Sequence, residues 1–203
     1  MSRIGIVDYG MGNLRSVQNA LAEIGQEAEL VGTPEAVAAC GRIIVPGVGA
    51  FQEAMENLRG PAMDAALDAH VRAGKPLLGI CLGMQLICRK SYEDGEHEGL
   101  GWIDAEARHF PPGEGIKVPH MGWNAVEYEA PHPLLTEVET GADVYFVHSY
   151  YVDCTDAGDI IGRTEHGIRF TSMVAHDNVY GMQFHPEKSQ SVGMRLLANF
   201  AKL

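Results

Sequence analysis

Apolar positions along the first half of the chain predict strands and helices in turn. Short apolar runs are typical of buried strands, and apolar residues at spacings of three and four are typical of amphipathic helices. The strand runs are residues 3–8, 29–31, 42–45 and 75–80. The helical patterns are residues 14–24, 34–39, 50–58 and 63–73, and Asn13 can cap the first of them. Such alternation predicts a parallel sheet covered by helices on both faces.

The second half of the chain has a different pattern. Strand candidates follow one another closely there, which indicates a mixed or antiparallel extension of the sheet. They are residues 125–128, 144–152, 160–164, 170–175 and 179–184. We expect loops at residues 93–101 and 111–115 and a closing helix at 189–202. With no repeat or linker, the chain is predicted to be one α/β domain over residues 1–203, with an open, mostly parallel but mixed sheet.

Composition narrows the partners that we expect. The 203 residues carry a net charge of −12, which argues against nucleic acid or an anionic membrane as the main partner. The first residues become charged too early for a signal peptide, and the uncharged stretch 76–88 is too short for a membrane helix. The four cysteines form no CxxC pair, which is typical of a reducing, cytoplasmic setting.

A cysteine stands where the last strand of the first half meets a helical pattern. Residues 79–83 read Gly-Ile-Cys-Leu-Gly, so Cys81 lies on a predicted sharp turn between two glycines. This is the cysteine counterpart of the G-x-S-x-G nucleophile elbow, which aims the side chain outward from a strained turn. A helix N-terminus behind the sulfur favours the thiolate. The alternative is a buried apolar cysteine, the usual fate of this residue.

A base for such a thiol is available near the end of the chain. Residues 183–187 read Gln-Phe-His-Pro-Glu and follow a predicted strand. In an extended segment the side chains of His185 and Glu187 can point the same way. Glu187 could then bond one imidazole nitrogen and leave the other for the sulfur. Taken alone, the segment is more typical of a surface His-Pro-Glu turn.

A glycine-flanked turn follows the third predicted strand. In Pro-Gly-Val-Gly at 46–49, the glycines allow the peptide planes to rotate, so that backbone N–H groups can face a developing oxyanion. The donors would be the N–H of Val48 and that of Leu82, the residue after the cysteine. In isolation this segment is simply a loop.

Metal and nucleotide sites have little support in the sequence. The nine histidines show no HExxH or paired spacing, and the glycine turn at 10–13 lacks the third glycine of G-x-G-x-x-G and the lysine of a P-loop. We therefore expect no metal and no cofactor.

Together, the motifs at 79–85 and 183–187, in this order and about 100 residues apart, resemble those of the class I (triad) glutamine amidotransferases. Segments at 8–13, 46–51, 119–124 and 145–150 are similar to one branch of that family, the glutaminase subunits of imidazole glycerol phosphate synthases. The resemblance runs from Ile4 to the last predicted helix. It implies hydrolysis of L-glutamine, with ammonia delivered to a separate (βα)₈-barrel cyclase subunit in histidine biosynthesis.

The resemblance also implies roles for individual residues. Cys81 would be the nucleophile, His185 the base and Glu187 its orienter. Val48, Gly49 and Leu82 would form the oxyanion hole. The glutamine-binding positions would be Gly47, Gln85, Glu93, Ser149 and Tyr150. The positions at the cyclase interface would be Asn13, Trp123, Tyr145 and Lys188.

Other functions remain open at this point. Another class I amidotransferase, of the anthranilate or guanylate type, would share both motifs, although the segment Pro-His-Met-Gly-Trp-Asn at 119–124 favours the first branch. A non-catalytic partner-binding module could retain the elbow, and a cysteine peptidase would need an extended groove that the sequence does not reveal.

Overall fold

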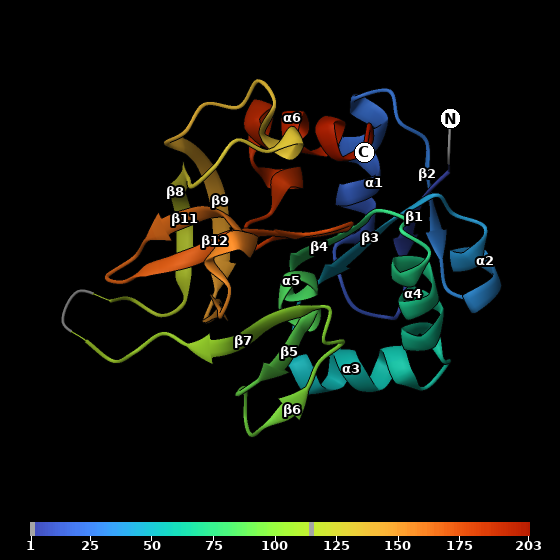
Figure 1. Cartoon of the computed structure of the whole chain (residues 1–203), viewed down its shortest axis with the longest axis horizontal. Helices are drawn as coiled ribbons and strands as arrows, with labels where there is room; N and C mark the ends of the chain where they lie inside the picture. Colours follow the sequence, from blue (N-terminus) through green and yellow to red (C-terminus); the bar gives the residue numbers. More distant parts are fainter. Residues whose placement is uncertain (1–2, 114–115) are drawn as a thin grey trace.

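The centre of the molecule is a parallel sheet, as the alternation of apolar runs predicts. The computed structural model describes residues 3–113 and 116–203, so the end of the predicted loop 111–115 lies outside the described residues. Five strands in the order β2-β1-β3-β4-β13 run parallel (Figure 1). They are β1 (Ile4–Val7), β2 (Ala28–Val31), β3 (Arg42–Gly47), β4 (Leu77–Cys81) and β13 (Val179–Met182).

Helices cover both faces of this sheet, which confirms the predicted fold class. On one face α1 (Leu14–Glu23) packs against α6 (Gln190–Phe200), and their apolar side chains share one core with β1 and β13 (Figure 1). A second core lies under the helices of the other face. These helices are α2 (Pro34–Ala38), α3 (Phe51–Arg59), α4 (Met63–Arg72) and α5 (Leu82–Leu86).

Beyond β13 the sheet becomes mixed. The order continues as β12-β10-β7-β5-β6, with antiparallel pairs except between β7 and β5, and β11, β8 and β9 form a branch from β12. These strands are β5 (Cys88–Ser91), β6 (His97–Glu98), β7 (Ile103–His109), β8 (His120–Tyr128), β9 (Ala142–His148), β10 (Tyr150–Cys154), β11 (Ile160–Glu165) and β12 (Arg169–His176).

Some boundaries in the second half differ from the sequence predictions. Strands β5 and β7 were not predicted, because β7 alternates small alanines with charged residues, a weak strand pattern. Strand β6 interrupts the predicted loop at 93–101. The predicted strand 144–152 is two strands, since the chain changes sheet partners at Ser149. Strand β13 ends at Met182 rather than at residue 184, and β8 begins at His120 rather than at 125.

Asn13 does stand at the N-cap of α1, but its side chain does not cap the helix backbone. Its Oδ1 accepts a hydrogen bond from the Ser16 hydroxyl at 2.8 Å instead.

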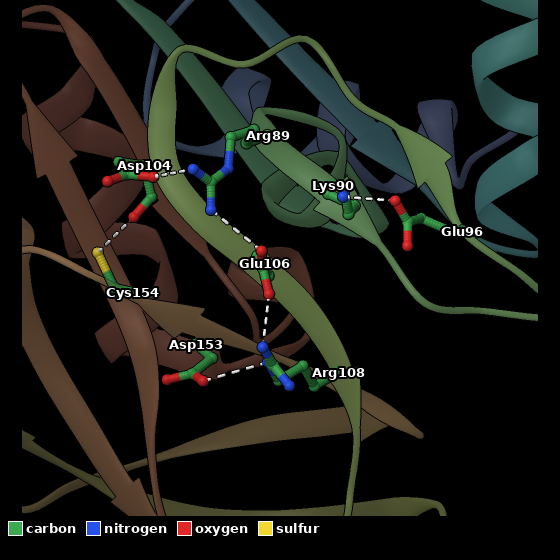
Figure 2. A network of polar contacts seen from close by, with 8 residues as sticks. All are labelled: Arg89, Lys90, Glu96, Asp104, Glu106, Arg108, Asp153 and Cys154. Atoms are coloured by element: carbon green, nitrogen blue, oxygen red, sulfur yellow. Dashed lines mark hydrogen bonds and ion pairs between the residues drawn. The ribbon is translucent and has the colours of Figure 1, made fainter.

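Charged side chains cross the solvent-exposed surface of β5, β7 and β10 (Figure 2). Glu106 lies between two guanidinium groups, with oxygen–nitrogen distances of 3.0 Å to Arg89 and 2.6 Å to Arg108. Arg89 also pairs with Asp104 at 3.1 Å, and Arg108 with Asp153 at 3.3 Å. Because exposed ion pairs each contribute little to the free energy of unfolding, this network adds only modestly to the stability of this part of the sheet.

Gly83, in α5, lies against the backbone of the parallel sheet at β3. A Cβ at this position would lie 1.8 Å from the carbonyl oxygen of Val45, a backbone atom of the neighbouring strand. We expect Gly83→Ala to lower the free energy of unfolding by about 3 kcal/mol or more, a Tm shift of about 6–12 °C for a chain of this length.

The matched control for this change is Gly60→Ala. Gly60 has an ordinary right-handed conformation at the end of α3, and a Cβ there would lie 3.4 Å from Glu56 O. Gly60→Ala should change the free energy of unfolding by less than about 1 kcal/mol. Thermal unfolding measures the stability of both variants. Equal stability of the two would contradict the claim that Gly83 is packed too closely against Val45 to carry a Cβ.

Candidate active site

Three parallel strands end side by side and bring together the segments identified in the sequence. In register, Gly47 of β3 pairs with Cys81 of β4, and Ile80 pairs with Met182 of β13. The carboxyl edge of an open α/β sheet is the usual place for a site. The glycine turn, the cysteine and the segment leading to His185 therefore leave the sheet at one edge.

Cys81 lies on the predicted strained turn. Its backbone has φ +55° and ψ −109°, between β4 and the five-residue helix α5. The flanking glycines are required: a Cβ at Gly79 would lie 2.5 Å from the carbonyl oxygen of Gly83. A non-glycine residue in such a conformation stores strain that the surrounding structure must sustain, which is typical of functional turns. The nucleophile-elbow interpretation of this segment is consistent with that geometry.

His185 and Glu187 form the second part of the site. The Nδ1 atom of His185 donates to Oε1 of Glu187 at 2.8 Å, and the two side chains are only 2% and 1% exposed. The expected extended link between them is wrong, because residues Pro186–Lys188 form a short 3₁₀ helix. The predicted contact nevertheless forms, and it fixes the tautomer that leaves Nε2 free of a proton when the ring is neutral.

The other ring nitrogen of His185 is available for chemistry. Among the described residues, Nε2 has no hydrogen-bond partner, and the Cys81 thiol is a neighbouring group that acts on the pKa of the ring. Burial lowers the pKa of His185, but interactions with Cys81 and Glu187 outweigh burial and raise it to about 9. A raised imidazole pKa favours the imidazolium form, and a neighbouring imidazolium stabilises a thiolate.

Backbone contacts hold His185 in place, and sequence reasoning missed the residue responsible. The His185 N–H donates to Tyr145 O at 2.9 Å, while the buried Ser189 hydroxyl donates to His185 O at 2.6 Å. Ser189 Oγ also accepts from the N–H of Tyr145 at 3.0 Å. One hydroxyl thus ties the histidine segment to β9, a role that no sequence pattern indicated.

The glycine turn adjoins the cysteine. Val48, immediately after β3, is 45% exposed, and Gly49 has φ +106° with its Cα facing Met11. The hydroxyl of Tyr9 donates to the carbonyl oxygen of Pro46 at 2.8 Å. Tyr9 was not predicted as a site residue. It anchors the start of the segment whose N–H groups are the expected oxyanion donors.

Removing the Tyr9 hydroxyl should loosen this segment. In Tyr9→Phe the buried carbonyl of Pro46 loses its donor, so we expect the free energy of unfolding to fall by about 1 kcal/mol, or about 2–4 °C in Tm. Amide hydrogen exchange should become faster at residues 47–49. Unchanged exchange there would contradict the anchoring role. Tyr180→Phe is the control, since its hydroxyl bonds only Asp177 O, at 3.2 Å.

Gln85 and Tyr150, two of the expected glutamine-binding positions, are in direct contact. Gln85 Nε2 donates to the carbonyl oxygen of Tyr150 at 3.0 Å and to Oε1 of Gln183 at 3.3 Å. Gln183 is fully buried, and its Nε2 lies 3.9 Å from Cys81 Sγ. The sequence motif contained Gln183, but nothing in the pattern assigned it a role.

Glu93 is near these residues but is already engaged. Its Oε2 accepts from the backbone N–H of Phe51, the first residue of α3, at 2.6 Å. Burial raises the pKa of the Tyr150 phenol, and the charges of Glu93 and Asp94 raise it further, which places Glu93 beside Tyr150. One carboxylate oxygen of Glu93 therefore holds the N-terminus of α3.

Three of the four expected partner-facing residues are in contact with one another. The ring centroids of Trp123 and Tyr145 are 6.0 Å apart, and the Lys188 ammonium lies 5.8 Å from the centre of the Tyr145 ring. Met121 and Trp123 are exposed at 65% and 49%, an uncommon exposure for large apolar side chains. Asn13 stands at the N-cap of α1, next to Gly12, where a Cβ would lie 3.3 Å from the carbonyl oxygen of Pro46.

Within residues 3–113 and 116–203, no group of three or more histidine, cysteine or acidic side chains is arranged to hold a metal ion. In the same part of the chain, no helix is both long and apolar enough to cross a membrane. The four cysteines are free thiols.

Comparison with known proteins agrees with this geometry. The family model for glutamine amidotransferase class-I matches residues 5–203. The chain is 50% identical to a protein from Sulfurimonas denitrificans named imidazole glycerol phosphate synthase subunit HisH, over 98% of this chain and 97% of that protein. A protein of the same name from Geobacter sulfurreducens is 44% identical over the full length of both chains.

Solved structures share the fold at much lower identity. A crystal structure titled as a glutamine amidotransferase superposes with a TM-score of 0.78 at 20% identity, covering 98% of this chain and 97% of that one. A chain in the structure of PurLQS from Thermotoga maritima gives 0.74 at 20% identity, covering 100% and 99%. Because the family model covers nearly all of the chain and full-length relatives approach half identity, the protein belongs to the class I glutamine amidotransferase family.

Proposed function

We propose that the protein is the glutaminase subunit of an imidazole glycerol phosphate synthase. It hydrolyses L-glutamine to glutamate and ammonia, and the ammonia passes to a separate (βα)₈-barrel cyclase in histidine biosynthesis. The observation that carries this proposal is the buried His185–Glu187 pair beside a strained Cys81 at one sheet edge. Full-length relatives that bear the name of this subunit support the choice within the family.

The geometry favours a covalent mechanism in two steps. The Cys81 thiolate attacks the side-chain amide carbon of glutamine, and the carbonyl oxygen becomes an oxyanion. The His185 imidazolium then gives its proton to the departing ammonia, leaving a thioester. Neutral His185 next takes a proton from water, whose oxygen attacks the thioester carbon. The C–S bond then breaks, which releases glutamate and restores the Cys81 thiolate and the His185 imidazolium. Glu187 holds the ring in the required tautomer throughout.

The remaining residues bind the substrate and its charges. The N–H groups of Val48 and Leu82, with Gly49, stabilise the oxyanion, and losing one such donor typically costs about 3–4 kcal/mol of barrier. Glutamine is held by a group of residues beside the sulfur. They are Gly47, Gln85, Glu93, Ser149 and Tyr150.

A partner docks on the exposed aromatic surface. Trp123, Tyr145, Lys188 and Asn13 contact the cyclase, and aromatic side chains at such positions commonly dominate binding. The whole chain, residues 1–203, acts as one glutaminase domain in the cytoplasm, without a cofactor. The acidic net charge of −12 suits a subunit that never holds the phosphorylated substrate.

Coupled activity tests the proposal. The purified chain is mixed with the cyclase of histidine biosynthesis and its nucleotide ligand, and glutamate release is measured with and without that partner. We expect strong stimulation and a one-to-one complex in a pull-down. Stimulation by an anthranilate- or guanylate-type partner, with none from the cyclase, would move the protein to another branch of the family. Labelling of Cys81 by a glutamine-like affinity reagent would distinguish a glutaminase of either branch from a non-catalytic partner-binding module.

A further inference from the structure

A row of buried and partly buried hydrogen bonds approaches the active site from β8, and the mechanism above does not use it. Asn124 Nδ2 lies 3.1 Å from His120 Nε2, and His120 Nδ1 lies 2.9 Å from His148 Nε2. His148 Nδ1 in turn lies 2.8 Å from the carbonyl oxygen of Tyr150. Both imidazoles are buried, and His120 stacks on Phe146 at a centroid distance of 4.6 Å. The row ends at the carbonyl oxygen of Tyr150, which also accepts a hydrogen bond from Gln85 Nε2.

Only one arrangement of protons satisfies these contacts. A carbonyl oxygen can only accept, so His148 Nδ1 carries the proton that faces Tyr150. The Nε2 atom of a neutral His148 is then an acceptor, and His120 Nδ1 must donate to it. His120 Nε2 becomes an acceptor in the same way, which requires the amino group of Asn124 to donate.

The Asn124 amide agrees with this direction at the far end of the row. Its Nδ2 also donates to the carbonyl oxygen of Glu165 at 2.9 Å, while its Oδ1 accepts from the N–H of Ala125 at 2.9 Å. The two hydrogens of the amino group therefore have two acceptors, and the amide cannot be reversed without losing all three bonds.

Both histidines must be uncharged for the row to exist. Burial lowers the pKa of His120 to about 4, and His166 lowers it as well. Burial also lowers the pKa of His148, to about 3, although its bond to the Tyr150 carbonyl acts in the opposite direction. A proton on either free nitrogen would place one N–H group against another. These imidazoles are therefore fixed hydrogen-bonding groups at neutral pH.

The contacts continue from Tyr150 to the nucleophile. Because the Tyr150 oxygen can only accept, Gln85 presents its amino group to that oxygen and to Gln183 Oε1. The orientation of the Gln183 amide follows, so that its Nε2 faces the sulfur of Cys81 at 3.9 Å. The Gln183 amino group therefore points at the nucleophilic sulfur.

We propose that this row, here named the polar chain, positions the glutamine-binding edge of the site relative to the Cys81 sulfur. The members of the polar chain are Asn124, His120, His148, Gln85 and Gln183. The inference rests on the proposed function, since it takes Gln85 and the Tyr150 backbone as glutamine contacts. The new positioning residues are Asn124, His120, His148 and Gln183. On β8, His120 and Asn124 face inward and alternate with the exposed Met121 and Trp123, so the polar chain begins directly beneath the proposed docking surface.

The proton arrangement can be observed directly. We expect imidazole ¹⁵N NMR of the full chain, labelled at histidine, to show His120 and His148 as neutral Nδ1–H tautomers at pH 7. The same state should persist in the complex with the cyclase. An Nε2–H tautomer or an imidazolium at either position would overturn the inference, whatever the activity.

A matched pair of variants tests the functional part. In His148→Asn the amide nitrogen lies near the former Nδ1 and keeps a donor for Tyr150 O, whereas His148→Gln places its amide near the former Nε2 and loses that donor. Both changes remove the ring from the same apolar surroundings. With the cyclase present, we expect His148→Gln to raise KM for glutamine about 10-fold with kcat nearly unchanged. His148→Asn should stay within about 3-fold of the original KM, since tenfold corresponds to about 1.4 kcal/mol.

Gln183 has its own readout. Gln183→Glu places a carboxylate oxygen at the Cys81 sulfur, so the midpoint of the pH dependence of thiol alkylation by iodoacetamide should move upward. Gln183→Met, which only removes the donor, should move it less. An unchanged midpoint in Gln183→Glu would remove Gln183 from the polar chain.

His70→Gln is the control for loss of a buried histidine. The His70 ring also bonds a backbone carbonyl, that of Pro76 at 3.1 Å, but at the opposite end of β4 from Cys81. The His70→Gln variant should have a lower free energy of unfolding and an unchanged KM for glutamine.

Equal KM changes in the two His148 variants, or a fall in kcat alone, would overturn the positioning role of the polar chain. A wild-type complex without glutaminase activity would instead refute the proposed function.

Discussion

Replacing Cys81 with alanine is expected to abolish glutamine hydrolysis, both alone and in the presence of the cyclase. The elbow presents one sulfur, and the Cys81 thiol is the nucleophile that lies beside the ring of His185 and raises its pKa. Without the Cys81 sulfur, the thioester cannot form and therefore cannot be hydrolysed. In comparable triads, loss of the nucleophile costs about 10⁶-fold in kcat, so we expect a fall of more than about 10⁴-fold here. The fall in kcat is measured as the rate of glutamate release at saturating glutamine.

The fold should tolerate this change. Alanine fits the space of the thiol, and the strained backbone at φ +55° is sustained by Gly79 and Gly83 on either side. Binding of the cyclase should therefore remain, as judged by a pull-down. Cys154→Ser is the matched control, because Cys154 lies at the end of β10 with its thiol bonded to Asp156 O at 3.4 Å. Comparable losses of activity in both variants would contradict the assignment of Cys81.

Sequence alone predicted the parts of the fold that local pattern determines. Strands such as β1 and β4 are continuous apolar runs, and glycines mark the turn around Cys81, so the parallel core and the elbow could be placed in advance. The residues themselves indicated His185 and Glu187 as a base for the Cys81 thiol, and the resemblance to a known family favoured that pairing over a surface turn. The structure brings these segments to one edge of the sheet.

Other elements depend on contacts that no local pattern encodes. Strand β7 has the sequence of a polar, alanine-rich segment and becomes a strand only because β5 and β10 lie on either side of it. The start of β8 was missed because its outward residues, Met121 and Trp123, are apolar, which hides the usual alternation. Asn13 looked like a helix cap, but its amide oxygen accepts from Ser16 instead.

The supporting residues of the site were missed for a related reason. Tyr9 and Ser189 act by bonding backbone carbonyls outside their own local pattern, Pro46 O in the first case and His185 O in the second. A hydroxyl residue carries no sign of such a partner in its own surroundings. Gln183 lay inside a recognised motif, and only the packing of its amide against Gln85 and Cys81 gives it a role.

Replacing Glu187 with glutamine should separate orientation of the base from its presence. The amide can occupy the same space, but its amino group can face Nδ1 and favour the wrong tautomer of His185. In serine-protease triads the equivalent change costs about 10⁴ in kcat, and we expect a fall between about 10² and 10⁴ here. Glu137→Gln is the control, since Glu137 pairs only with Arg195 on the surface. A loss of less than about 3-fold in Glu187→Gln would contradict the orienting role.

The same variant should change how stability depends on pH. The folded-state pKa of His185, about 9, lies above the ordinary value of 6.5, because Cys81 and Glu187 outweigh burial. A group with a raised folded pKa contributes stability that is fully present below about pH 6.5 and is lost as pH rises through about 9. Glu187→Gln removes one negative charge and lowers that pKa. The free energy of unfolding should therefore differ more between the original chain and the variant at pH 6 than at pH 9.5. Denaturant titrations at both values measure this difference, and a gap that widened with rising pH would mean that the ion pair does not form.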